Sequence, residues 1–252
     1  MDPVLKAILR SWDWRIDVII VLLLLGMLYT RGWWLLRRRS QRTAKQNRAR
    51  KRLRLAVPIR LVSYLTGLVL IGLALMSPID IMSQQLFLMH MIQHLLLIMF
   101  APPLLLLANP LPFILWGLPT GLRYRFGELL SNLLHRESPF RRNLRKVTSP
   151  GIIWMIWVVS VIGWHDPNMY NAALRVGWIH DVEHLSFFFA GMLFWWHITG
   201  AGPRIHRGDN LVGRIALAIA AIPPNMITGV VLAFSPNAVY TYYEAVPRIY
   251  GI

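Results

Sequence analysis

Long apolar segments separated by polar connections form the main pattern along this chain. A membrane-spanning helix needs roughly 20 predominantly apolar residues. Six segments reach or approach this length, and they are Ile16–Trp34, Val57–Met76, Leu86–Leu107, Ile152–Trp164, Trp178–Thr199 and Leu211–Phe234. The pattern therefore predicts an all-α fold, a polytopic membrane helix bundle with six transmembrane helices, of which the fourth is short.

Two pairs of adjacent prolines interrupt these segments. Pro102-Pro103 lies in the third segment and Pro223-Pro224 lies in the sixth. In a membrane helix such pairs favour kinks, and we expect the freed carbonyl groups to find partners in the bundle. The first segment is followed by a basic run and not by a small-residue cleavage site, which favours a span over a signal peptide.

The composition also indicates a membrane protein. Hydrophobic residues make up 56% of the chain and charged residues 15%, whereas a soluble domain usually carries about 25% charged residues. We expect a single membrane domain over residues 1–252, in which residues 1–56 form the N-terminal span with a basic cytoplasmic loop and residues 57–252 form the helix bundle. The absence of cysteine excludes disulfides, thiolate metal sites and thiol redox chemistry.

The positive charge of the chain is unevenly distributed. Lys and Arg number 27 against 11 Asp and Glu, which gives a formal net charge of +16. Most of these cations lie in the connections after the first, third and fifth predicted spans, so the positive-inside rule predicts that these connections are cytoplasmic and the N-terminus is extracytoplasmic. We interpret the basic run Arg31–Arg60 as a topology anchor that contacts anionic lipid head groups, and we expect no nucleic-acid partner. The segment Leu111–Leu134 is expected to form an amphipathic helix on the inner face.

The eight histidines fall into two groups. His135 and His206 lie in basic connections and are expected to be solvated or lipid-facing, whereas His197 lies near the cytoplasmic end of the fifth span, where an interfacial role is expected. The other five are predicted to lie at one depth on the extracytoplasmic side, although they come from three different helices. These five are His90, His94, His165, His180 and His184.

The spacing of these five histidines indicates a site for a metal ion or haem. The pairs His90/His94 and His180/His184 are each four residues apart, so each pair shares a helix face and can chelate one ion. Ionisable groups within membrane spans usually face the bundle interior and mark function. Nearby polar side chains are expected to orient the metal-bound imidazoles. They are Gln93, Asp181, Glu183, Asp80 and Asp166.

The sequence leaves the bound species open between copper, zinc and haem iron, all of which accept imidazole. Met82, Met89 and Met91 lie near the first pair and favour Cu(I), although methionines in an apolar chain more often fill the core. Two histidines on facing helices suit a b-type haem electron carrier. The segment His180–His184 matches H-x-x-E-H, in which two histidines bind zinc and the glutamate activates water, so a membrane zinc hydrolase using Glu183 is a further alternative.

Three separated blocks of the sequence resemble the CtaG-like assembly factors of haem–copper cytochrome c oxidase. The resemblance covers most of the chain from about Ser77 to Tyr250. Its blocks are His90-Met91-Ile92-Gln93-His94-Leu95-Leu96-Leu97 with Ala101-Pro102-Pro103-Leu104, Trp164-His165-Asp166-Pro167 with Tyr170 and Ala172-Ala173-Leu174, and Glu183-His184-Leu185-Ser186-Phe187-Phe188 with Phe194-Trp195-Trp196.

The resemblance implies a multi-pass protein of the bacterial cytoplasmic (inner) membrane that aids copper insertion into cytochrome c oxidase subunits, and hence a metallochaperone, not an enzyme. The five histidines named above are then the candidate copper ligands. Asp166 stands where the family pattern has an apolar residue, and it adds a candidate carboxylate ligand. Members of the family usually continue into a further span introduced by an Asp-Gln motif, so the resemblance leaves open whether a seventh span follows Ile252 or is absent from this protein.

Overall fold

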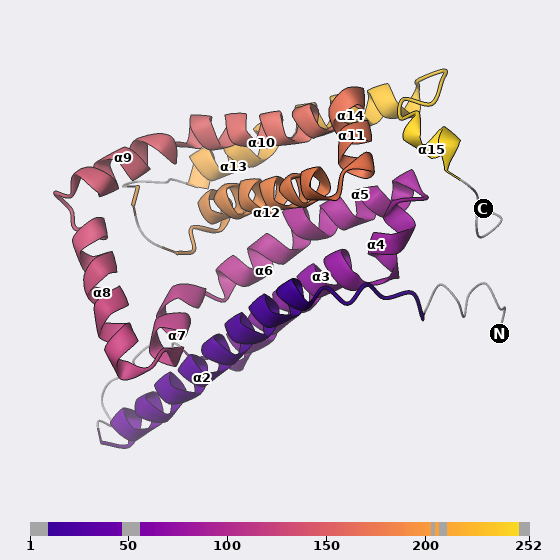
Figure 1. The fold of residues 1–252 in the computed structure, drawn as a ribbon. Coiled ribbons are helices and arrows are strands. Elements are labelled where there is room, and N and C mark those ends of the chain that lie inside the picture. Colours follow the sequence, from indigo (N-terminus) through magenta and orange to yellow (C-terminus); the bar gives the residue numbers. More distant parts are fainter. Residues whose placement is uncertain (1–9, 47–55, 203–204, 207–210, 247–252) are drawn as a thin grey trace.

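The computed structural model of the chain describes residues 10–46, 56–202, 205–206 and 211–246 (Figure 1). Within these residues the regular elements are all helical, so the all-α prediction is confirmed. They are α2 (Ile16–Gln46), α3 (Pro58–Met76), α4 (Pro78–Ser83), α5 (Phe87–Leu95), the π-helical turn η1 (Leu96–Phe100), α6 (Ala101–Leu107), α7 (Pro110–Gly117), α8 (Thr120–Leu134), α9 (Pro139–Val147), α10 (Pro150–Trp164), α11 (Pro167–Arg175), α12 (Gly177–Thr199), α13 (Leu211–Ala220), α14 (Ile222–Ala233) and α15 (Tyr242–Ala245).

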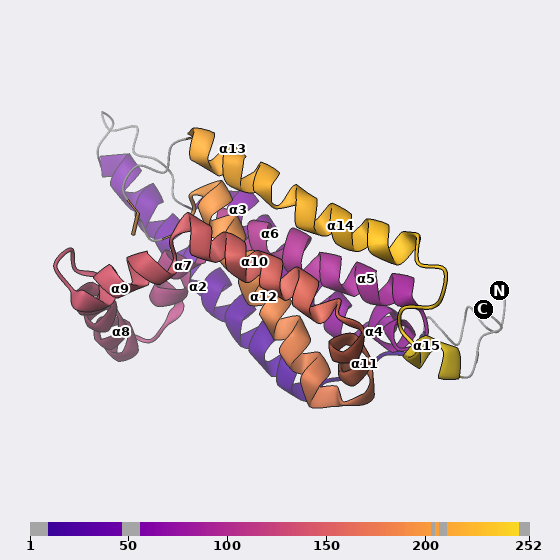
Figure 2. The same cartoon turned by 90° about the horizontal axis from the view of Figure 1, so that it is seen from above.

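The long helices run alongside one another, and short helices lie at both ends of the bundle (Figure 1). α12 packs against η1, α6 and α10, whereas α2 packs along α3 and α7. At one end of the bundle α8 runs across beside α7 and α9, and at the opposite end α4, α11 and α15 gather (Figure 1 and Figure 2). The basic helix α9 therefore lies at the end of the bundle opposite α4 and α11, which directly precede α5 and α12 in the chain.

Among the described residues, four helical stretches are long and apolar enough to cross a membrane. They are Ile16–Gln41, Pro58–Met76, Phe87–Leu107 and Leu211–Ala233. A fifth span results if α9 and α10, which meet at a bend of 52°, form one broken span. The multi-pass membrane prediction is therefore supported, whereas the predicted number of six spans is not confirmed.

The helix α12 is the predicted span that is missing even when the bent pair of α9 and α10 is counted as a fifth span. Its 23 residues are enough to cross a membrane, yet it is not among the apolar stretches. Three histidines, one aspartate and one glutamate interrupt its apolar sequence, and each of these side chains lowers the hydropathy that marks a span. The residues that make α12 a candidate for function are thus the same residues that weaken its membrane signal.

Large apolar side chains point outward along the apolar stretches. Ile20, Leu24 and Met27 on α2 are at least half exposed, as are Met226 and Val231 on α14. A soluble monomer rarely exposes continuous apolar faces of this kind. Lipid chains are the surroundings that such faces require.

The first proline pair interrupts the span that begins with α5. Pro102 has no amide hydrogen to donate to the carbonyl of Ile98, four residues earlier, and the π-helical turn η1 forms there. The indole Nε1 of Trp195 on α12 donates to this carbonyl at 3.0 Å. The close approach of α12 to η1 requires a glycine at position 191 of α12, because a Cβ there would lie 2.7 Å from the Ile98 oxygen. The bond ties α12 to the helix segment that carries the first histidine pair.

The second proline pair shows the same arrangement. Pro224 cannot donate to the carbonyl of Ala220, which instead accepts a hydrogen bond of 2.8 Å from Nε1 of Trp154 on α10. The expectation that groups within the bundle satisfy the freed carbonyls is therefore confirmed at one carbonyl of each pair. Tryptophan supplies the donor in both cases.

The predicted amphipathic helix Leu111–Leu134 is wrong as one continuous element. The structure divides it into α7 and α8, because Leu118 is extended, as is usual for a residue that precedes proline, here Pro119. α8 contains no buried residue and lies across the end of the bundle (Figure 1). The surface location expected for the segment is thus met by α8 alone.

Candidate metal centre

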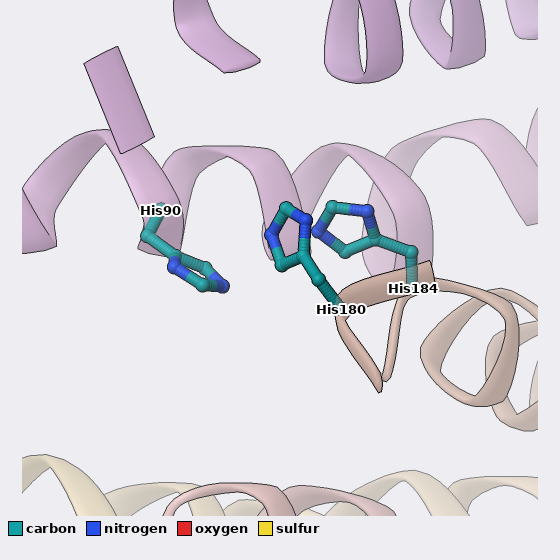
Figure 3. Close-up of side chains that lie close together, drawn as sticks. All are labelled: His90, His180 and His184. Atoms are coloured by element: carbon teal, nitrogen blue, oxygen red, sulfur yellow. The ribbon is translucent and has the colours of Figure 1, made fainter. Parts of the chain in front are cut away.

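Two helices supply most of the polar groups of the candidate site. α5 presents His90 and His94 on one buried face, since residues four apart point to the same side of a helix. α12 presents Glu183 and His184, both buried, with His180 one turn earlier. Figure 3 shows the rings of His90, His180 and His184 directed toward one another from these two helices. These five residues are called the inner cluster below.

The inner cluster is tightly packed. Nε2 of His90 lies 2.8 Å from Nε2 of His94. The Glu183 carboxylate lies 3.5 Å from each of these two nitrogens, through Oε2 and Oε1 respectively. The His180 ring centroid is 4.0 Å from that of His184 and 5.2 Å from that of His90. The structure therefore brings both predicted histidine pairs together in one place.

Two overlapping groups of the inner cluster have ligand atoms close enough to share an ion. His90, His180 and His184 form one group, and His90, His94 and Glu183 form the other, with all ligand atoms of a group within 4.8 Å of one another. Two nitrogens bonded to one tetrahedral ion at about 2.05 Å are about 3.3 Å apart. The separations of 2.8 and 3.5 Å between the atoms of the second group lie within about half an ångström of that value.

The hydrogen-bond balance of the inner cluster fits a bound cation. His94 Nδ1, His180 Nε2, both ring nitrogens of His184 and both carboxylate oxygens of Glu183 are buried, and each lacks a hydrogen-bond partner within the described part of the chain. Buried polar atoms are normally paired, because an unpaired one costs about 1–3 kcal/mol. An ion bound by imidazole and carboxylate would satisfy several of these atoms at once.

Gln93 supports the inner cluster from behind and does not enter it. Its side-chain nitrogen donates to the Ala74 carbonyl at 2.8 Å and to Asp80 Oδ1 at 2.6 Å. These bonds hold α5 against α3 and α4. Burial raises the pKa of the Asp80 carboxyl to about 6, although the hydrogen bond from Gln93 opposes this shift.

Two of the carboxylates predicted to orient imidazoles have other partners. Asp181 accepts two hydrogen bonds from Arg15, one on each carboxylate oxygen, and so joins the start of α2 to α12. Asp166 caps the N-terminus of α11 by accepting from the backbone amides of Asn168 and Met169. The structure does not bring either carboxylate into the inner cluster.

A group of tyrosines beside the inner cluster escaped the sequence analysis. Tyr243 donates its hydroxyl hydrogen to the Ser83 carbonyl at 2.8 Å, and the same oxygen lies 3.4 Å from Nδ1 of His90. The rings of Tyr170 and Tyr240 stack at a centroid distance of 3.8 Å. The sequence signal was the run of tyrosines after the last apolar segment, on the side of the membrane predicted for the histidines.

His165 lies at the edge of the inner cluster. It follows the last residue of α10, and its ring centroid is 6.3 Å from that of His94. Nδ1 of His165 lies 2.6 Å from the Val161 carbonyl oxygen, and Nε2 lies 3.4 Å from Sδ of Met91. Burial lowers the pKa of the His165 imidazole, which favours the neutral ring.

The remaining histidines lie elsewhere. His135 is exposed after α8, which agrees with the expected solvated position. His206 is half-buried and lies 3.0 Å from the Thr148 hydroxyl, and its ring centroid is 5.0 Å from that of His197, which is only 4% exposed. The two rings therefore pack together at the end of α12 away from the inner cluster, and neither joins the candidate site.

The fold and the site define a multi-pass helical membrane protein with a buried histidine–glutamate cluster. The family model of the cytochrome c oxidase caa3 assembly factors (Caa3_CtaG) matches residues 27–250. The chain belongs to this family. The resemblance found in the sequence is confirmed over nearly the whole chain.

Similar proteins extend the comparison. Uncharacterized proteins of Mycobacterium bovis and Mycobacterium tuberculosis are each 29% identical over 258 residues, which cover 97% of this chain and 35% of their own length. An uncharacterized protein of Mycobacterium leprae is 27% identical over 197 residues, or 74% of this chain and 28% of its own length. The chain thus spans about a third of the length of the first two curated relatives. No solved structure matches the chain significantly.

Proposed function

We propose that this protein is an assembly factor for haem–copper cytochrome c oxidase that holds copper in the inner cluster and aids its insertion into oxidase subunits. Copper is the cargo, and the protein acts as a metallochaperone without turnover chemistry. The family match supports the process. The inner cluster supports the chemistry, because it offers four imidazoles and one carboxylate, and several of their buried atoms lack hydrogen-bond partners within the described residues.

The donor set suits an ion that must be released again. Imidazole and carboxylate bind copper without the thiolates that would hold it more tightly, and the chain contains no cysteine. Gln93 and its partner Asp80 position α5 behind the imidazoles, and such supporting contacts commonly change metal affinity by about 10–100-fold. His165 serves in this proposal as an additional copper ligand or gate at the edge of the inner cluster.

The proposed location is the bacterial cytoplasmic membrane with the inner cluster toward the extracytoplasmic side. The basic segments around α8 and α9 lie at the end of the bundle opposite the inner cluster (Figure 1), and the positive-inside rule assigns such segments to the cytoplasm. Six spans follow if α12 and the bent pair of α9 and α10 both cross the membrane. Anionic lipid head groups then surround the cytoplasmic arginines, several of which stack on tryptophan rings, as Arg38 does on Trp34 at 3.4 Å.

A b-type haem is less compatible with the packing. Two axial histidines from facing helices must stand on opposite faces of a flat macrocycle, whereas the ring centroids of His90 on α5 and His180 on α12 are only 5.2 Å apart. Gln93 and Glu183 are 0% exposed and Phe187 is 2% exposed, and these side chains fill the space around the rings. A visible absorption spectrum of the purified protein decides between copper and haem, since a Soret band that shifts on reduction would support haem.

An experiment can also distinguish a zinc hydrolase from the proposed metallochaperone. In the H-x-x-E-H arrangement the glutamate activates a water at the metal, and its replacement abolishes activity while the metal stays bound. In this chain Glu183 is itself close enough to His90 and His94 to share an ion with them. The metallochaperone proposal therefore predicts that replacing Glu183 weakens metal binding, whereas the hydrolase alternative predicts retained metal.

The test of the proposed function is the state of the oxidase in cells. Cells lacking this protein receive either the wild-type chain or a variant in which His90, His94, His180 and His184 are replaced by asparagine, and His135→Asn is the matched control. We expect the wild type and the control to restore the copper content and activity of cytochrome c oxidase, and the fourfold variant to restore neither. Full restoration by a membrane-inserted fourfold variant would contradict the proposal.

A further inference from the structure

An imidazole and a thioether face each other at the edge of the inner cluster. Nε2 of His165 lies 3.4 Å from Sδ of Met91, although the two residues are 74 positions apart in the chain. Neither residue belongs to the two groups of the inner cluster that can share an ion. Both side chains are half-buried, whereas His90, His94 and His184 are buried.

The position of the proton on the His165 ring determines the nature of the contact between His165 and Met91. Nδ1 of His165 lies 2.6 Å from the Val161 carbonyl oxygen, and a carbonyl oxygen only accepts hydrogen bonds. Nδ1 therefore carries the proton of the neutral ring, and Nε2 presents a lone pair to the sulfur of Met91. The sulfur is also an electron-pair donor, so in this tautomer the contact places two metal-ligand atoms face to face.

The separation and the chemistry of the two atoms fit a soft monovalent ion. A nitrogen and a sulfur bound at about 2.0 and 2.3 Å to one ion are about 3.5 Å apart at a near-tetrahedral angle. The observed distance is 3.4 Å. Thioether and imidazole together form a neutral, soft donor pair, which favours Cu(I) over zinc.

We propose that Met91 and His165 form an outer Cu(I) site, separate from the inner cluster, from which the ion passes to an acceptor protein. The inference rests on the proposed function, since it assigns the exit step of copper delivery. Two protein ligands leave coordination positions open, and the half-buried location lets a ligand of the acceptor reach the ion. Transfer is a ligand exchange in which copper stays Cu(I) and both side chains leave as neutral donors.

The experiment titrates full-length detergent-purified protein with Cu(I) under anaerobic conditions and records copper X-ray absorption. Met91→Leu removes the sulfur at nearly constant volume. Met89→Leu is the matched control, because Met89 is half-buried on the same helix and belongs to neither the inner cluster nor the Met91–His165 contact. His165→Asn is a second variant that removes the other ligand of the outer site.

We expect the wild type and Met89→Leu to bind one more Cu(I) per chain than Met91→Leu and His165→Asn. A sulfur neighbour at about 2.3 Å from copper should be present in the first two proteins and absent from Met91→Leu. Copper bound by nitrogen and oxygen alone in the wild type, or sulfur retained in Met91→Leu, would overturn the outer site and leave the proposed function standing. A failure of every protein to bind copper would overturn both.

Discussion

Oε2 of Glu183 lies 3.5 Å from Nε2 of His90, and both side chains are 0% exposed. A carboxylate at this depth requires a compensating charge or hydrogen bonds, because burial of an unpaired polar group is costly. A neutral imidazole supplies no charge, and neither carboxylate oxygen has a hydrogen-bond partner within the described residues, whereas a bound cation would compensate the carboxylate directly. The pair is therefore consistent with the proposal that the inner cluster holds an ion.

The first prediction concerns this carboxylate. Glu183→Gln keeps the size of the side chain and removes its charge, so we expect the affinity for Cu(I) to fall by at least about 10-fold while the fold is retained. Competition with a coloured Cu(I) chelator measures the affinity. Glu244→Gln, at an exposed position on α15, should leave it unchanged, and an equally unchanged affinity in Glu183→Gln would exclude the carboxylate as a ligand.

The second prediction concerns pH. Burial raises the pKa of the Asp80 carboxyl to about 6, against 3.8 in the unfolded chain. The folded state therefore binds the proton more tightly, and this group contributes stability at low pH that is lost as the pH rises from about 4 to about 6. Asp80→Asn keeps an oxygen that can accept from Gln93, so we expect its thermal midpoint to depend less on pH than the wild-type midpoint in this window. If the thermal midpoints of the wild type and Asp80→Asn changed with pH in the same way, the assignment of this pH dependence to Asp80 would be refuted.

The third prediction concerns the carbonyl of Ile98 that Pro102 leaves without a backbone donor. Trp195→Phe removes the indole donor, and we expect a loss of about 1–3 kcal/mol of stability. Pro102→Ala restores an amide at the correct position, so the loss should be smaller in the Pro102→Ala background. Thermal unfolding of the four proteins in detergent gives the coupling energy. Simple additivity of the two changes would show that the indole bond does not compensate the proline.

The fourth prediction concerns orientation in the membrane. The chain contains no cysteine, so a single introduced thiol reports one position without background. Asn237 lies on the connection between α14 and α15, and α15 is at the same end of the bundle as α4 and α11. Glu137 lies between α8 and α9, at the opposite end. A membrane-impermeant thiol reagent added to intact cells should label Asn237→Cys and spare Glu137→Cys. The reverse labelling pattern would invert the proposed topology.

Much of the candidate site could be predicted from the sequence because helix geometry is regular. Residues four apart share a face, which brings His90 beside His94 and His180 beside His184 once each helix forms. Hydropathy also located the helices that carry them. The sequence also predicted that the proline pairs free backbone carbonyls, although it could not name Trp195 as the donor to Ile98, since that depends on how α12 packs.

The rest depends on contacts between distant segments, which periodicity does not encode. Asp181 was expected to orient an imidazole, yet it pairs with Arg15, 166 positions away. Tyr243 reaches His90 across 153 positions. α12 shows a further limit, because the polar residues that fit a metal site reduce the hydropathy by which a span is recognised.

The most direct test of the central claim uses His90, which belongs to both groups of the inner cluster that can share an ion. Elemental analysis of the detergent-purified wild type, His90→Asn and the exposed control His135→Asn, each loaded with copper and freed of excess, gives the copper content per chain. We predict that the wild type and His135→Asn retain copper in stoichiometric amounts and that His90→Asn loses the copper of the inner cluster. Equal copper contents in all three proteins would contradict the assignment of the inner cluster as the metal centre.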